Sequence, residues 1–296
     1  MSAPDTFSGG DAQILDRGYR RYDGPRTGVR GAVGAVVLHS AQRALGMRRS
    51  IWAKVLPVAT IGFAYLPAIV FVGVLALFPR ADTASILLPS YGDYYGFIIS
   101  AIMVFVALVA PEVLCTDRRT GMLGVYLAAP LDRDSYLFAK AVSIAGVLSI
   151  VCLGPPLLML IANVLQSTGP EGVGEILDTT WRVLITGVVE TLLFTGITMG
   201  VTSLTDRKAV ASAGIILLFL ISLSMTATID VAGAPAGVYV MAPTLLGLEI
   251  APRIHGEYSL IMDGVPSITL WLAWAAWTFG GFALARNRLK HLPVTR

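Results

Sequence analysis

Charged residues that could carry chemistry gather in residues 115–140, which read CTDRRTGMLGVYLAAPLDRDSYLFAK. The acids in this segment show neither D-x-x-x-D nor H-x-x-x-H spacing, so the pattern does not indicate metal or acid–base catalysis. Inside the charged flanks, residues 122–127 are mostly apolar, and Pro130 follows them. Because proline disfavours helix at the residue before it, we predict about two helical turns that end there. Such a helix suits a groove on another protein, or it packs back on the membrane surface, and the spacing leaves both open.

Few other residues could carry chemistry. Glu190 lies about eight residues into an apolar stretch, and an ionisable residue inside a membrane is a functional candidate. The alternative role for Glu190 is a packing hydrogen bond. Cys115 and Cys152 indicate neither a disulfide framework nor a metal site. The sequence holds no G-x-x-x-x-G-K-[ST], so we expect no P-loop ATPase, bound metal or cofactor in this chain.

The composition places these residues in a membrane protein. Of the 296 residues, 55% are hydrophobic and only 14% are charged, whereas soluble domains carry about a quarter charged residues. The apolar residues form blocks of the length that crosses about 30 Å of hydrocarbon as a helix. We therefore predict an all-α integral membrane protein with six transmembrane helices. They are expected near residues 55–78, 97–114, 141–164, 183–204, 209–229 and 268–285.

Lysine and arginine predict the orientation of these helices. Every second connection is basic, and both terminal segments are basic as well, so both termini and the 115–140 loop are expected on the cytoplasmic side. Because the sequence starts with a polar segment, we expect no cleaved signal peptide. The basic residues of the loop, of the connection after the fourth span and of the tail are Arg118, Arg119, Arg133, Lys140, Arg207, Lys208, Arg286, Arg288, Lys290 and Arg296.

The rest of the chain divides around these spans. Residues 1–27 are expected to form a cytoplasmic arm, and residues 28–50 a moderately amphipathic helix. That helix either lies in the membrane interface or packs on its own protein. A six-span domain covers residues 51–286, and residues 287–296 form a tail. Within the domain, residues 230–266 are too apolar for a solvated loop and too rich in proline for a span. They form either a re-entrant region or an outer loop with a packed apolar patch.

The loop also resembles a known family. Glu112 at the end of the second span is followed by Asp117–Arg118, Thr120–Gly121, a leucine-rich turn, Pro130 with Arg133, and Lys140 at the start of the next span. This pattern, with six spans and an N-terminal interfacial helix, resembles the type-2 permeases of ATP-binding-cassette transporters. Where the family more commonly has Gly-Thr-Leu-Glu, this sequence has Gly-Met-Leu-Gly at residues 121–124.

The resemblance implies a function. The chain would be the permease subunit of an ATP-driven exporter in the plasma (inner) membrane, paired with a second permease copy and surrounded by membrane lipids. ATP and Mg would bind a separate P-loop ATPase subunit, and no nucleic acid is expected as a partner. The loop would be the ATPase-coupling helix, and residues 230–266 would form re-entrant outer helices. The residues implied in coupling are Arg118, Thr120, Gly121, Met122, Leu123, Tyr126, Leu127 and Arg133, and Glu190 is a candidate for the transport path.

Two other classes of function stay open on the sequence alone. One is an integral-membrane enzyme that modifies lipids, and the other is a membrane subunit that only anchors or regulates a partner. Co-purification with an ATPase would separate the exporter from the enzyme. Substrate-stimulated ATP hydrolysis would separate the exporter from the anchor. The residues do not indicate a substrate.

Overall fold

The described part of the chain is helical. A computed structural model describes residues 24, 28–47, 50–77, 89–128, 130–233, 235–257 and 261–291, and no β-strand occurs in these ranges. Most of the predicted arm over residues 1–27 and the end of the tail lie outside them. Within the described ranges, six helical segments are long and apolar enough to cross a membrane, which confirms the predicted fold class. They are Ile51–Leu77, Tyr94–Arg119, Arg133–Leu165, Gly172–Thr202, Lys208–Val231 and Ser267–Lys290.

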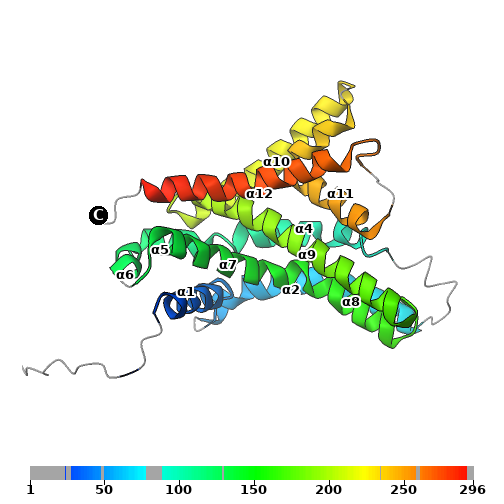
Figure 1. The fold of residues 1–296 in the computed structure, drawn as a ribbon, viewed down its shortest axis with the longest axis horizontal. Coiled ribbons are helices and arrows are strands. Elements are labelled where there is room, and N and C mark those ends of the chain that lie inside the picture. The colour runs from blue at the N-terminus through cyan, green and yellow to red at the C-terminus, as the bar shows by residue number, and fades with distance from the viewer. Residues whose placement is uncertain are drawn as a thin grey trace, which may run out of the picture.

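Helix α9 (Gly172–Thr202) runs through the middle of the molecule (Figure 1). Its 31 residues rise about 46 Å, and it packs on α7 (Arg133–Cys152), α11 (Pro243–His255) and α12 (Ser267–Lys290). The hydroxyls of Thr195, Thr198 and Thr202 donate to carbonyls four residues earlier at 2.6–2.7 Å. These bonds satisfy polar groups that have no water to pair with, so threonine is tolerated in the most buried span.

Glycines let α9 and α12 approach closely. A Cβ atom built on Gly281 would lie 2.0 Å from the carbonyl oxygen of Gly196, and one on Gly196 would lie 2.4 Å from the carbonyl oxygen of Thr278. At Gly200, a Cβ atom would lie 3.1 Å from the Cα atom of Gly281. Gly196 and Gly200 stand four residues apart, a spacing that is typical of close helix approach in membranes, and their partner here is α12.

Two of the spans are broken by proline. The second span consists of α4 (Tyr94–Leu108) and α5 (Glu112–Arg119), with Pro111 just before α5. The third consists of α7 and α8 (Gly154–Leu165). Pro155 and Pro156 occupy the first turn of α8, where a missing backbone N–H leaves no bond unmade. The first span, α2 (Ile51–Leu77), packs on α4 and α8.

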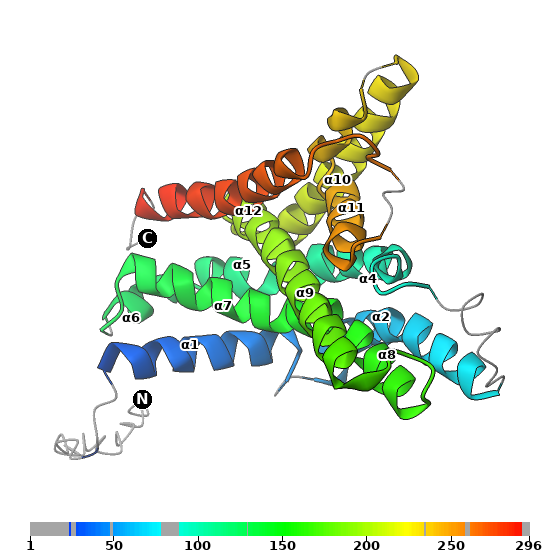
Figure 2. The same cartoon turned by 45° about the vertical axis from the view of Figure 1, so that its right-hand side comes forward.

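The region between the last two spans packs on the bundle (Figure 2). After α10 (Lys208–Val231) come a 3-10 helix, η1 (Ala236–Met241), and α11, which contacts α9, α4 and α12. Arg253 fixes the segment after α11, because its guanidinium donates to the carbonyls of Met262 and Val265 at 2.7 Å and pairs with Glu249 at 2.8 Å. Leu246, Ile250, Met262 and Val265 of this region are buried in one apolar cluster, and re-entrance into the membrane stays a prediction.

The N-terminal helix α1 (Gly28–Ala44) lies along α7 and also contacts α5. Both views show it beside the start of α7 (Figure 2). The side of this helix predicted to be apolar holds Val29, Val33, Val36, Ser40, Ala44 and Met47; its middle residues Val36, Ser40 and Ala44 are buried, whereas Val29 and Met47 near its ends are exposed. The helix thus packs on its own protein through that side, and its contact with lipid stays a prediction.

Candidate functional site

The charged residues of the 115–140 segment gather at one end of the bundle. There α1, α5, α6 (Leu123–Ala128) and the start of α7 meet the C-terminus of α12. We call this the basic end, defined by Arg43, Arg118, Arg133, Arg286 and Lys290. Figure 1 shows α6, the end of α12 and α1 on the same side of the molecule. The short helix predicted before Pro130 is present as α6.

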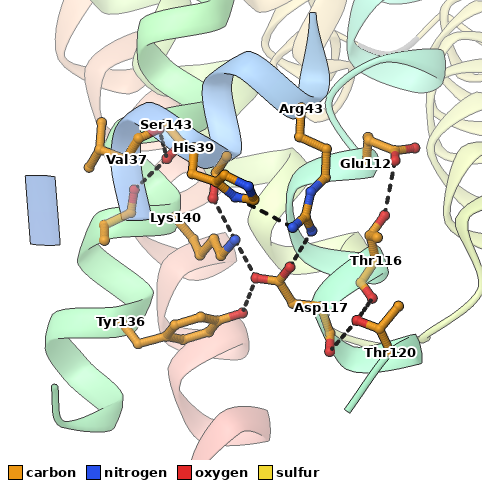
Figure 3. Close-up of polar contacts among 12 residues, drawn as sticks. Val37, His39, Arg43, Glu112, Thr116, Asp117, Thr120, Tyr136, Lys140 and Ser143 are labelled. Atoms are coloured by element: carbon orange, nitrogen blue, oxygen red, sulfur yellow. Dashed lines mark hydrogen bonds and ion pairs between the residues drawn. The ribbon is translucent and has the colours of Figure 1, made fainter. Parts of the chain in front are cut away.

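A buried carboxylate lies at the centre of the basic end (Figure 3). Asp117, in the last turn of α5, has a fully buried side chain, and one of its oxygens pairs with Arg43 of α1 at 2.5 Å. Its other oxygen pairs with Lys140 of α7, whose side chain is also fully buried. Unpaired charges cost several kcal/mol in such surroundings, so these ion pairs fix three helices at one point.

Hydrogen bonds complete this network. The hydroxyl of Tyr136 donates to Asp117 at 3.3 Å, and the ammonium of Lys140 donates to the hydroxyl of Ser40 at 2.6 Å. One turn further along α7, the hydroxyl of Ser143 donates to the carbonyl of Val37 at 3.1 Å. These contacts run from α7 to α1 and α5. We refer to Arg43, Ser40, Asp117, Tyr136 and Lys140 as the Asp117 network.

The short helix α6 packs on this network through its apolar side chains. Leu123 is buried, at 7% exposure, and the rings of Tyr126 and Tyr136 lie 5.7 Å apart. The ammonium of Lys140 lies 5.6 Å from the ring centroid of Tyr126, which is within the range of a cation–π contact. Burial raises the pKa of the Tyr126 hydroxyl above its usual value of 10. Leu123 and Tyr126 therefore hold α6 on the bundle, and Leu127 is half-buried beside them.

Two arginines of the predicted coupling set bind helix ends. The guanidinium of Arg118 donates to the carbonyls of Thr202, Ser203 and Thr205 at 2.7–3.3 Å. Arg133 donates to the carbonyls of Leu289 and Lys290 at the end of α12. The last carbonyls of a helix lack partners within it, and arginine is suited to satisfy them. The segment is thereby tied to α9 and α12 as well.

The remaining residues of the predicted coupling set face outward. Thr120 and Gly121 are exposed, Met122 is half-buried, and Gly121 adopts φ +70°, a conformation that favours glycine. Val125 of α6 is 61% exposed. Beside them opens a cleft of about 390 Å³. Its lining residues are His39, Gln42, Arg43, Met47, Thr116, Thr120 and Met122.

Sequence reasoning placed neither Arg43 nor Ser40 in the site, and it included Asp117 only through the family pattern and Lys140 through that pattern and the orientation. Lys140 carried a signal, because it is the eighth residue of a membrane-length helix, and an ionisable residue there requires a partner. Its hydrogen-bond partner on α1, Ser40, lies a hundred residues away in the sequence. Spacing along the chain therefore could not identify it.

Glu190 lies apart from the basic end. Its side chain is buried within α9, at 1% exposure, and its carboxylate faces Gly247 of α11, where a Cβ atom would lie 2.6 Å from one oxygen. Neither oxygen accepts a hydrogen bond from the residues that the structure describes. The carboxylate thus occupies the contact between α9 and α11 inside one protomer.

The other end of the bundle carries its own polar contacts. The hydroxyl of Ser90 donates to Glu257 at 2.7 Å, and the backbone N–H of Gly92 donates to the same carboxylate at 3.3 Å. Burial raises the pKa of Glu257, although these hydrogen bonds oppose the shift. Within the described ranges, no group of three or more His, Cys, Asp or Glu could hold a metal ion. These contacts join the start of the second span to the end of α11.

The fold and this geometry define an integral membrane bundle with a network of paired charges at one end. A sequence model of the ABC-2 family of transporter proteins matches residues 15–285, and the chain belongs to this family. A search of curated proteins finds no match. Family membership identifies the chain as the membrane permease component of a transporter.

Proposed function

We propose that the chain is the permease subunit of an ATP-driven exporter and forms the substrate path together with a second copy. A separate P-loop ATPase subunit hydrolyses ATP, and residues 115–140 transmit its movement to the spans from the cytoplasmic side. Membership of the ABC-2 family supports this proposal, because a permease without its own P-loop needs an external source of energy.

The Asp117 network is the observation that carries the coupling role. It joins α5, α7 and α1 through a carboxylate that is shared by two cations, and Tyr126 links α6 to the same point. A push delivered at α6 therefore moves the ends of the second and third spans as one unit. Packed, hydrogen-bonded contacts of this kind transmit displacement because they deform little.

The surface that meets the ATPase consists of the outward-facing residues. Thr120, Gly121, Met122 and Val125 present a small, mostly apolar patch, and Arg119 lies exposed at its edge. An apolar centre with a charged rim is the usual composition of a protein interface. Leu123 and Tyr126 pack on the bundle side of α6 and hold this patch in place.

Glu190 is proposed to act in transport at the contact between α9 and α11. A buried acid without a partner among the described residues is costly to keep, which supports a functional reason for it.

One experiment tests the coupling surface. The full chain is purified through a tag with its ATPase, and the retained ATPase and the ATP hydrolysis are measured for wild type and for Val125→Asp. We expect Val125→Asp to lose most of the ATPase, because a charge would enter an apolar contact.

The matched control is Val173→Asp, since Val173 is 76% exposed at the other end of α9. It should retain the ATPase fully. If Val125→Asp also retains full ATPase and full hydrolysis, residues 115–140 are not the contact. Loss of the ATPase in both variants would reflect damage to the protein and would equally remove support for a specific surface.

A further inference from the structure

An apolar groove runs along the surface of the bundle between α7, α9 and α12, and the coupling function does not use it. Its volume is about 550 Å³, which lies within the range of about 300–1,000 Å³ that is usual for ligand sites. Asp134 and Arg286 stand at one end of the groove. The other lining residues are Leu137, Phe138, Ala141, Val142 and Ala145 of α7, Leu192 and Thr195 of α9, and Phe282 of α12.

The length of the groove matches one leaflet of a membrane. Its lining on α7 extends from Asp134 to Ala145, and eleven residues of helix rise about 17 Å. The hydrocarbon core is about 30 Å thick, so one leaflet contributes about 15 Å. A chain that lies in the groove would therefore start at the basic end and extend along α7 for about the length of one leaflet.

The walls of the groove are open to the surroundings. Phe138 is 63% exposed and Val142 is 38% exposed, and both lie on a helix of membrane-spanning length. The one hydroxyl in the lining, that of Thr195, donates to the carbonyl of Thr191 at 2.6 Å. The interior of the groove is therefore lined by apolar side chains, which is the lining that a lipid acyl chain requires.

The mouth of the groove carries an ion pair, in which Asp134 occupies two of the donors of Arg286. The Nε and Nη2 atoms of Arg286 donate to the two oxygens of Asp134 at 2.8 Å each, and both side chains are about half exposed. Arg133 donates to the last carbonyls of α12, which holds the first turn of α7 beside the last turn of α12.

These two helix ends have an excess of two positive charges. The charged residues concerned are Arg133, Arg286, Arg288 and Lys290, against Asp132 and Asp134. Basic residues at a membrane surface attract anionic head groups, and arginine is suited to phosphate because its planar donors match the oxygens.

We infer that this groove binds an anionic phospholipid of the leaflet at the basic end. One acyl chain lies along Phe138, Ala141 and Ala145, and the phosphate group lies beside Arg286. The site is independent of the ATPase contact, because α6 and residues 119–122 before it do not line it.

The test uses native mass spectrometry of the full chain in detergent. Dioleoyl phosphatidylglycerol or dioleoyl phosphatidylcholine is added, and the lipid retained on the protein is counted. We expect the anionic lipid to be retained preferentially. Arg286→Gln should weaken its binding about fivefold, the effect of losing one basic residue at a lipid surface.

Two further variants separate the site from general surface charge. Arg288→Gln removes the same charge from the same helix, but Arg288 does not line the groove, so this variant should weaken binding clearly less than Arg286→Gln does. Ala145→Phe adds a ring inside the groove and should reduce retention of the anionic lipid while Arg286 is intact. The folded state of each variant is checked by its thermal unfolding.

Three results would overturn the inference. Equal loss in Arg286→Gln and Arg288→Gln would show a diffuse charge effect. Equal retention of the two lipids would show that the head group is not recognised. If Ala145→Phe keeps its lipid but changes the oligomeric state, the groove is an interface between copies of the chain.

Discussion

Replacing Asp117 by asparagine should destabilise the protein strongly. Asparagine keeps the size of the side chain but removes the charge that Arg43 and Lys140 share. The side chain of Lys140 is fully buried, so its ammonium would be left without a counter-ion. Breaking a buried ion pair on one side costs about 3–5 kcal/mol. Arg43 is 17% exposed and can turn toward water, so the lower end of this range applies.

The assay is thermal unfolding of the full chain in detergent. At about 2 °C for each kcal/mol in a chain of this size, a loss of 3 kcal/mol lowers Tm by about 6 °C. Asp134→Asn is the matched control, because it breaks an ion pair that is about half exposed on both sides. Such surface pairs contribute little, so this variant should unfold close to wild type.

A double variant tests the cause. Asp117→Asn combined with Lys140→Met removes both buried charges and keeps similar volumes. Neutral replacements of a buried ion pair are often well tolerated, so most of the lost stability should return. The reasoning is refuted if Asp117→Asn unfolds no earlier than Asp134→Asn, or if Lys140→Met worsens Asp117→Asn instead of rescuing it.

Three other predictions follow from the fold. Gly196→Leu should abolish folded protein in size-exclusion chromatography, because its Cβ atom would meet the backbone of Thr278 at 2.4 Å; Gly73→Leu, which faces open space, should not. Glu190→Gln should leave folding intact and lower transport, and unchanged transport would return Glu190 to a packing role. For the orientation, Glu171→Cys should react with an impermeant thiol reagent from outside the cell and Arg207→Cys should not; the reverse labelling would contradict the cytoplasmic position of both termini.

The spans could be predicted from the sequence because one physical requirement decides them. A helix in hydrocarbon must satisfy its backbone internally and must cover about 30 Å, so length and apolarity alone identify it. The break of the third span was visible for a similar reason, since Pro155 and Pro156 cannot continue the ladder of hydrogen bonds in α7. The spacing of Gly196 and Gly200 is a local pattern that indicates a close contact with another helix. No such pattern identifies α12 as the partner.

The candidate site could be predicted only in part. Pro130 predicted where α6 ends, whereas the directions of Leu123 and Tyr126 depend on Lys140 and Tyr136, which belong to another helix. The apolar side chains of α6 indicated that this helix packs on something, but they did not identify whether the contact lies within the chain or on another protein. In the structure, Leu123 and Tyr126 satisfy that need within the chain, and Val125 stays exposed.

This division of α6 explains why charged residues flank an apolar core in residues 115–140. Apolar packing alone would hold α6 on the bundle but would allow it to slide, because such contacts are not directional. Asp117 is directional: it accepts from Arg43, Tyr136 and Lys140, each from a defined side. Under the proposed coupling role, a load on Val125 would pass through Tyr126 to Tyr136 and Lys140, and the Asp117 ion pairs would then move α5, α7 and α1 together.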